Sequence, residues 1–226
     1  MALHFTTTDQ SALNGVKVLV HGPSGIGKTR LCATAPKPII LSAESGLLSL
    51  REFKIPVMEI NTVEDLIEAH QWFLTNPHAK QFETVCLDSI SEMGEKVLAN
   101  AKKQVKDPRQ AYGELIDKMT ATVKAFRDLD GFNVYMAAKT EGVKDEISGA
   151  VLWGPSMPGT KMGPALPYLF DEVFAFRKNK TQQGVEYTYL QTSRDLQYEA
   201  KDRSGSLDLM EEPNLTKIFN KIRGVK

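Results

Sequence analysis

A run of nine residues near the start of the chain has the composition and spacing of a phosphate-binding loop. The run is His21-Gly22-Pro23-Ser24-Gly25-Ile26-Gly27-Lys28-Thr29, which fits the pattern G-x-x-x-x-G-K-S/T. In such loops, backbone N–H groups turn inward on a polyphosphate, the lysine reaches the β- and γ-phosphates, and the hydroxyl group holds Mg²⁺. Residues 22–29 therefore predict a site for ATP and Mg²⁺, with an ordinary glycine-rich turn as the alternative.

The segments on either side of this loop are those that the motif requires. Val16–Val20 is apolar and rich in valine, which predicts a strand, and a helix is predicted over 28–33. A phosphate-binding loop of this type lies where a strand passes into a helix. The local pattern therefore agrees with the motif.

A carboxylate ends a second apolar run, Thr84–Asp88. Such a run is typical of a strand that is buried on both faces of a parallel sheet. A carboxylate near the Mg²⁺ completes a nucleotide site of this kind, so Asp88 is predicted to be a metal ligand together with Thr29. Asp88 could also cap the helix predicted to begin near Ser89, and the two roles are compatible.

Another acidic side chain, Glu44, follows a short strand predicted at Ile39–Ser42. This position places it at the crevice outside the carboxyl ends of the strands, where α/β proteins bind ligands. The residue after Asp88 is Ser89 and not a glutamate, so the base that activates water must come from elsewhere. Glu44 is the candidate base, and a solvated loop glutamate is the alternative.

Three cations are further candidates for the chemistry of a phosphoryl group. Lys139 ends a strand predicted at Phe132–Ala138 and could reach the γ-phosphate from the same edge of the sheet. Lys201 and Arg203 are two residues apart, so on an extended segment they point the same way. Paired cations can neutralise the charge that develops on a transferred phosphoryl group. On spacing alone, a solvated lysine and a charged turn are the alternatives.

The rest of the pattern alternates strands with helices. Helices are predicted at 63–74, 90–101, between Asp107-Pro108 and Gly131, and at 215–222, and strands at 172–177, 185–190 and 196–200. The last three strands predict an antiparallel extension of the sheet. The alternation as a whole predicts an α/β fold with a mostly parallel sheet and helices on its faces. With 226 residues, one domain over 1–226 is expected.

The segment from Gly142 to Gly163-Pro164 has a different character. It is rich in glycine and proline and shows little periodicity. This composition predicts a long mobile loop. Long loops in compact domains are usually functional, with a disordered or partner-binding loop as the alternative.

Bulk properties restrict the partners and the compartment. The 28 basic and 28 acidic residues balance, so no global field predicts binding to nucleic acid or to a membrane. Cys32 and Cys86 have no metal-binding spacing and are predicted to be core residues. No apolar run approaches the length that spans a bilayer, and Met1–Thr6 has no features of a secretory signal. A soluble, cytoplasmic protein is expected.

These elements, taken in order, resemble the RecA-like ATPase core, in particular the small phage single-strand annealing ATPases of the Sak type. The resemblance covers roughly Val16 to Gly205 and depends on Gly22–Thr29, Glu44, Asp88, Lys139 and Lys201-x-Arg203. Relatives often have Asp-Thr-Glu-Gly where this chain has Ser42-Ala43-Glu44-Ser45-Gly46, so the base role rests on Glu44. Lys201-Asp202-Arg203-Ser204-Gly205 is similar to the Lys-x-Arg-x-Gly element that DnaB-type helicases insert into the site of a neighbouring subunit.

The resemblance implies an ATPase that uses ATP and Mg²⁺, with Glu44 orienting the attacking water. It implies a homo-oligomer, either ring or filament, in which Lys201 and Arg203 complete a neighbour's site. It also implies that a loop at Thr140–Lys161 holds single-stranded DNA, with Lys144, Lys161, Trp153 and Met157 available for contacts. Annealing or strand exchange in a host cytoplasm, with a single-strand binding protein as a further candidate partner, follows from the same resemblance.

Two other functions remain open at the level of sequence. A nucleotide or small-molecule kinase shares the phosphate-binding loop, but it would need an arginine-rich lid, and no such helix is evident. A nucleotide-gated DNA-binding module with negligible turnover is the second alternative. The ATPase is distinguished from both by turnover that depends on Glu44 and responds to DNA.

Overall fold

The computed structural model describes residues 14–44, 46–144, 146 and 149–225. The expectation for Met1–Thr6 lies outside the described residues, as does Ser45 of the predicted acidic segment. Among the described residues, no helix is both long enough and apolar enough to cross a membrane.

Six neighbouring strands form the parallel part of the sheet. In spatial order they are β7 (Glu172–Lys180), β1 (Lys17–His21), β5 (Asn133–Lys144), β4 (Thr84–Asp88), β2 (Pro38–Ser42) and β3 (Val57–Glu59). Successive side chains of a strand point to opposite faces. In β1, Leu19 packs into one hydrophobic core, whereas Val18 and Val20 pack into another. The apolar character of the central strands is therefore explained by burial on both faces.

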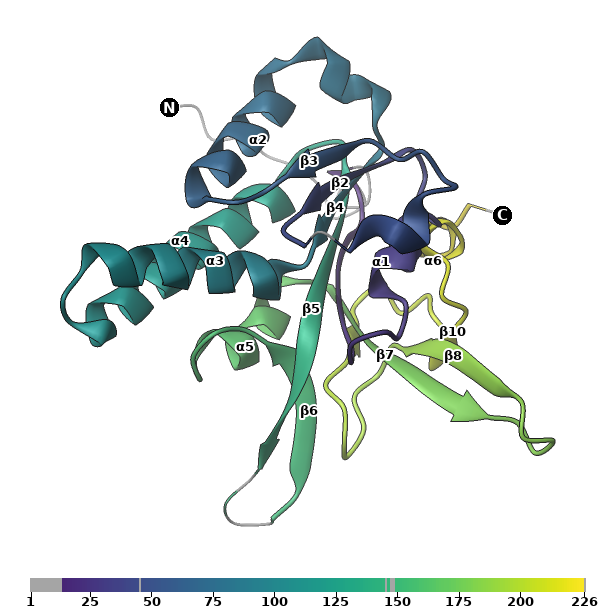
Figure 1. The fold of residues 1–226 in the computed structure, drawn as a ribbon. Coiled ribbons are helices and arrows are strands. Elements are labelled where there is room, and N and C mark those ends of the chain that lie inside the picture. Colours follow the sequence, from purple (N-terminus) through teal and green to yellow (C-terminus); the bar gives the residue numbers. More distant parts are fainter. Residues whose placement is uncertain (1–13, 45, 145, 147–148, 226) are drawn as a thin grey trace, which may run out of the picture.

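Helices cover both faces of the parallel strands (Figure 1). On one face lie α2 (Val63–Thr75), α3 (Ile90–Gln104) and α4 (Pro108–Arg127), and on the other lie α1 (Lys28–Cys32) and α6 (Leu215–Arg223). Short helical turns are α5 (Met162–Ala165), η2 (Leu47–Leu50), η3 (Pro77–Gln81) and η4 (Leu166–Leu169). Cys32 of α1 and Cys86 of β4 are both buried in the core beneath α1, as predicted.

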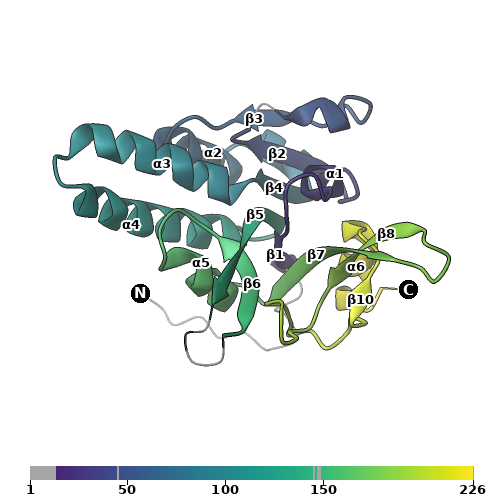
Figure 2. The same cartoon turned by 60° about the horizontal axis from the view of Figure 1, so that its bottom comes forward.

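The remaining strands are antiparallel to their partners. They are β6 (Val151–Ser156), β8 (Glu186–Gln191), β9 (Lys201–Asp202) and β10 (Met210–Glu211), paired with β5, β7, β7 and β8 respectively. The fold class predicted from the sequence is confirmed: a mostly parallel sheet flanked by helices, with antiparallel strands toward the C-terminus (Figure 2). One detail differs, because the strand predicted at 172–177 is β7, which is parallel to β1. The antiparallel extension begins only at β8.

The long loop predicted over 142–164 is largely a β-hairpin. β5 continues to Lys144, and β6 returns beside it with Val151 opposite Lys144. A side chain on Gly142 would come within 2.7 Å of Val151 Cγ1, so the glycine reflects close cross-strand packing. Pro155 is tolerated because β6 lies at the edge of the sheet: among the described residues, its strand pairing beyond β5 is confined to the bridge between Trp153 and Tyr198. The prediction of a long loop is therefore wrong for residues 142–144 and Val151–Ser156, which are strand, and for residues 162–164, which begin α5, whereas residues 157–161 are turn and irregular structure.

The prediction of a strand at 196–200 is also wrong. The Oδ1 of Asp195 accepts hydrogen bonds from the N–H groups of Gln197, at 2.7 Å, and Tyr198, at 2.6 Å. A side chain that binds its neighbouring amides in this way competes with pairing in a sheet. Tyr198 makes only an isolated bridge to Trp153, and the nearest named strand, β9, begins at Lys201.

Candidate functional site

The phosphate-binding loop lies between the carboxyl end of β1 and the start of α1, as the motif predicts (Figure 2). Gly25 and Gly27 have φ angles of 75° and 116°, in the left-handed region that side chains rarely adopt. A side chain on Gly22 would lie 3.1 Å from both the Cβ and the carbonyl oxygen of Phe176 on β7. The course of the loop therefore requires glycine at these positions, as expected of a cradle that phosphate approaches closely.

Lys28 begins α1, and its ammonium group folds back over the loop. The Nζ donates to the carbonyl oxygens of Gly22, at 2.7 Å, and Pro23, at 2.9 Å. Burial lowers the pKa of Lys28. The carbonyl oxygen of Lys28 accepts a hydrogen bond from the hydroxyl of buried Tyr135 on β5, at 2.9 Å. Tyr135, which the sequence analysis did not identify, thus anchors the start of α1 to the sheet.

Asp88 ends β4 and is buried. Burial raises the pKa of this carboxyl group, while hydrogen bonding by the Thr29 side chain and the charge of Lys28 lower it. Mg²⁺ prefers oxygen ligands, and in proteins it takes one or two carboxylates together with phosphates and water. A hydroxyl and a buried carboxylate that lie together fit this donor set. Thr29 and Asp88 are therefore suited to hold the predicted ion.

Glu44 and Ser89 follow two paired strands and meet at the edge of the sheet. The strands β2 and β4 pair with Ser42 opposite Asp88, and Ser89 Oγ donates to Glu44 Oε1 at 3.0 Å. The same Ser89 hydroxyl accepts from Glu92 N at 3.3 Å and caps α3. The alternative that Asp88 caps this helix is wrong, because Ser89 is the N-cap. Serine is a preferred N-cap, so the sequence did contain the signal for this residue.

The sequence predicted Lys139 at the end of a strand, but it lies inside β5, where this strand changes partners. The pairing of β5 with β1 ends at Ala138, and its pairing with β6 begins at Lys139. The Nζ of Lys139 forms ion pairs with Glu92 and, at 2.7 Å, with Glu95 of α3. Burial alone would lower the pKa of Lys139, but the two glutamates raise it, so the ammonium group stays charged.

One cleft of about 750 Å³ collects these side chains at the carboxyl ends of the parallel strands. Its lining includes much of the loop and nine residues beyond it: Arg30, Glu44, Gly46, Ser49, Asp88, Ser89, Glu92, Lys139 and Thr140. Five residues that the sequence predicted as site residues line this cleft within one chain: Lys28, Thr29, Glu44, Asp88 and Lys139.

Lys201 and Arg203 lie elsewhere. The strand β9 pairs with the first two residues of β7, which is the end of the parallel strands opposite to the phosphate-binding loop. The Nζ of Lys201 donates to the carbonyl oxygen of Pro167 at 2.6 Å. Arg203, with 60% of its side chain exposed, forms an ion pair with Asp171 at 3.1 Å. A role for these cations in phosphoryl chemistry therefore requires the cleft of a second copy.

Residues predicted to contact DNA are only partly placed for that purpose. Lys144 and Lys161 are exposed, and Trp153 on β6 is 40% exposed, with its ring packed beside Gly142 of β5. Met157 is 3% exposed and belongs to the core. The expected base contact by Met157 is therefore wrong, whereas the other three side chains are accessible.

His21, next to the loop, is a buried structural residue. Its Nε2 lies 2.7 Å from the carbonyl oxygen of Glu199 and its Nδ1 lies 3.1 Å from Thr140 Oγ1. Burial lowers the pKa of His21 to about 4, so the ring is neutral at pH 7 and Nε2–H donates to Glu199. His21 thus connects the end of β1 to the hairpin and to the segment before β9.

The comparison with protein families agrees with this geometry. The profile of a family described as AAA domain matches residues 14–204. The structure is also similar to that of a KaiC-like protein, PH0186, from the hyperthermophilic archaeon Pyrococcus horikoshii OT3. The two chains are 13% identical, with a TM-score of 0.43, over 78% of this chain and 77% of that one. No curated protein matches the sequence.

Proposed function

The chain belongs to the AAA-domain family, and from this premise we propose that it binds and hydrolyses ATP in the cleft around residues 22–29. The loop amides and Lys28 bind the phosphates, and Lys28 exchanges the carbonyl oxygens of Gly22 and Pro23 for phosphate oxygens. Thr29 and Asp88 are suited to hold Mg²⁺, which when bound neutralises charge on the phosphates. 

Glu44 is proposed to orient the attacking water and accept its proton. The hydrogen bond from Ser89 to Oε1 fixes the direction of this carboxylate at the cleft. A general base has to lie within hydrogen-bond reach of the proton that it removes, so orientation matters as much as pKa. Lys139 is proposed to contribute positive charge near the γ-phosphate, in competition with its ion pairs to Glu92 and Glu95.

The observation that carries this proposal is the meeting of Glu44, Asp88 and Lys28 in one cleft. We expect Lys28→Ala to lose nucleotide affinity, measured by calorimetry, and Glu44→Gln to retain affinity but lose turnover. Glu68→Gln is the matched control, because Glu68 is an exposed carboxylate on α2, away from the cleft. Unchanged affinity in Lys28→Ala would exclude the cleft as the ATP site. Retained turnover in Glu44→Gln would exclude Glu44 as the base.

We further propose that Arg203 and Lys201 complete the cleft of a neighbouring copy in a homo-oligomer, either ring or filament. Lys28→Ala and Arg203→Ala should each be inactive alone. Mixed, they should recover activity, because one variant supplies the intact arginine and the other the intact loop. Arg194→Ala is the control, since Arg194 is similarly exposed, with 61% of its side chain accessible. Absence of recovery would contradict action between subunits.

Single-stranded DNA is the proposed partner of this assembly, in annealing or strand exchange of the phage type. The support is the hairpin of β5 and β6, in which exposed Trp153 lies on a strand paired to the one that carries Lys139. Aromatic side chains near cations bind bases by stacking. We expect oligo-dT to stimulate ATP turnover, and we expect Trp153→Ala to lose this stimulation. DNA-independent turnover would favour a kinase, and ATP binding without turnover would favour a nucleotide-gated module.

A further inference from the structure

Two carboxyl groups face each other where the segment that carries Arg203 joins the sheet. β9 runs antiparallel to the start of β7, with Asp202 directly opposite Glu172. Directly opposite residues of antiparallel strands have neighbouring side chains on the same face, and like charges there are destabilising. Two ionised carboxylates at this position would therefore weaken the pairing on which the placement of Arg203 depends.

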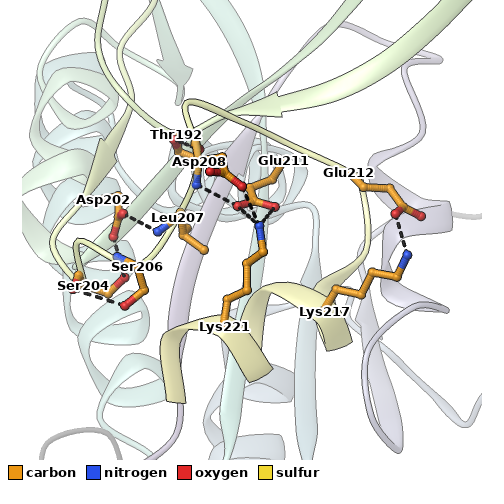
Figure 3. Close-up of polar contacts among 10 residues, drawn as sticks. All are labelled: Thr192, Asp202, Ser204, Ser206, Leu207, Asp208, Glu211, Glu212, Lys217 and Lys221. Carbon is orange, nitrogen blue, oxygen red and sulfur yellow. Dashed lines mark hydrogen bonds and ion pairs between the residues drawn. The ribbon is translucent and has the colours of Figure 1, made fainter. Parts of the chain in front are cut away.

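Asp202 organises the turn that follows Arg203 (Figure 3). Its Oδ1 accepts from Ser204 Oγ at 2.6 Å and from Gly205 N at 3.0 Å, and its Oδ2 accepts from Leu207 N at 3.1 Å. Burial alone would raise the pKa of Asp202, but these hydrogen bonds hold it below its usual value. Asp202 is therefore the ionised member of the pair, and its charge holds the turn together.

Glu172 has the opposite environment. It is 3% exposed, and its Oε1 accepts from Ser204 N at 3.2 Å. No N–H or O–H donor in the described part of the chain reaches its buried Oε2. Burial raises the pKa of Glu172 to about 8, and the charge of Asp202 adds to the effect. A proton on Glu172 that is donated to Asp202 satisfies the buried oxygen and removes the repulsion between the two groups.

The cations around Glu172 are bound to other partners, so they do not replace this proton. Lys201 donates to Pro167, and the Nζ of Lys17 donates to two carbonyl oxygens at 2.6 Å. The charged groups on the elements packed around Glu172 are Asp171, Lys201, Asp202 and Arg203 near β7 and β9, Lys17 on β1, Arg127, Asp128 and Asp130 at the end of α4, and Arg223 on α6. Arg203 itself pairs with Asp171.

We propose that Glu172 and Asp202 are positioning residues that share a proton and thereby clamp the Arg203 turn onto β7. Loss of the proton places two negative charges opposite each other and releases the turn. The inference rests on the proposed role of Arg203 only for its effect on ATP hydrolysis, because the clamp itself is a property of one chain.

The far end of the same segment is held by a different device (Figure 3). Lys221 of α6 binds both carboxylate oxygens of Glu211, at 2.7 and 2.9 Å, and Asp208 Oδ2 at 2.8 Å. Thr192 Oγ1 donates to the carbonyl oxygen of Asp208 at 2.7 Å. These contacts pair opposite charges and need no shared proton. Release above neutral pH is therefore confined to the part of the segment between Asp202 and Asp208.

The test is trypsin cleavage of the Arg203–Ser204 bond, compared between the parent chain and Glu172→Gln at each pH. The amide of the variant donates to Asp202 at every pH and its Oε1 still accepts from Ser204, so the variant should stay protected. With a pKa of about 8 for Glu172, the deprotonated fraction rises from about a tenth at pH 7 to about nine-tenths at pH 9. Parent cleavage relative to the variant should therefore rise about tenfold.

Two further variants make the result specific. Asp202→Asn removes the second negative charge, so ionisation of Glu172 no longer places like charges opposite each other and the cleavage step should be lost. Glu212→Gln removes a carboxylate that, within the described part of the chain, pairs with Lys217 alone, at 2.6 Å, so it should keep the parental step. Equal pH dependence in the parent and in Glu172→Gln would overturn the clamp, as would a cleavage step of parental size in Asp202→Asn.

ATP hydrolysis, measured on the same proteins, separates the clamp from the proposed function. If Arg203 acts on a neighbour, parental activity relative to Glu172→Gln should fall over the pH range in which cleavage rises. A cleavage step without this fall would support the clamp and refute the role of Arg203 in hydrolysis.

Discussion

Ser89→Ala separates the two roles of one hydroxyl group, because Ser89 both donates to Glu44 and caps α3. The variant removes the hydrogen bond that orients the proposed base, and it also removes the acceptor for the backbone N–H of Glu92. The first loss should lower kcat with little change in KM, since it affects the attacking water and not the binding of the phosphates. The second loss should lower stability alone.

Both effects have magnitudes that an experiment can resolve. Loss of an N-cap hydroxyl costs about 1 kcal/mol, which lowers Tm by about 2–4 °C for a chain of this size. A hydrogen bond to a charged group contributes about 1.5–3 kcal/mol when it is well shielded from water. Glu44 is exposed, so we discount this contribution to about 1 kcal/mol, or about fivefold in kcat.

Steady-state kinetics and thermal unfolding of Ser89→Ala should be compared with those of Thr62→Ala. Thr62 caps α2, where its side chain accepts from Asp65 N at 3.1 Å, and it does not line the cleft. The two variants should lose similar stability, but only Ser89→Ala should lose kcat, and Ser89→Thr should restore part of it. Equal kcat values for Ser89→Ala and Thr62→Ala would refute the positioning of Glu44 by Ser89.

Three other substitutions test the cleft and its supports. Because burial raises the pKa of Asp88, ionisation of this carboxyl group destabilises the fold as pH rises. Calorimetry without Mg²⁺ or nucleotide should therefore show a higher Tm for Asp88→Asn than for the parent at pH 7, and the difference should shrink in acid, where Asp88 is protonated. Gly27→Ala, at a φ of 116°, should cost about 1–2 kcal/mol of stability and weaken ATP binding, as measured by denaturant unfolding and calorimetry. Gly184→Ala, at a φ of 81° and outside the cleft, should cost similar stability but leave ATP binding unchanged. His21 has a pKa of about 4 in the folded chain, below its unfolded value, so the free energy of unfolding should fall as pH is lowered from 6.5 to 4. Urea titration should show a smaller fall in His21→Gln, which has no imidazole to protonate.

Much of the cleft was predictable because its residues follow local rules. The loop is a contiguous motif, and Asp88 ends an apolar run whose burial on both faces was visible in its composition. Such signals depend on a few neighbouring residues. Ser89 was available to the same kind of reasoning as an N-cap. Its second role has no local signal, because the contact with Glu44 spans 45 positions along the chain.

The hairpin shows where composition misleads. Glycine and proline are loop formers on average, yet Gly142 lies in a strand because the Trp153 ring and the Val151 side chain occupy the space beside it. That reason is a contact between strands, and it cannot be read from either strand alone. The prediction at Leu196–Ala200 failed for a different, local reason: Asp195 binds the amides of Gln197 and Tyr198, and this contact outweighs the β-forming residue types that follow it.

The position of Lys139 depends on strand order, which no local pattern specifies. β5 lies between β1, which leads into the phosphate-binding loop, and β4, which ends in Asp88. Only this central place lets one strand anchor α1 through Tyr135 and also bring Lys139 to the cleft. Had β1 and β4 been neighbours, β5 would lie outside the pair, and Lys139 would not lie between the loop and α3. The cation near the proposed γ-phosphate is thus a consequence of topology, whereas the loop that binds the phosphate is a consequence of sequence.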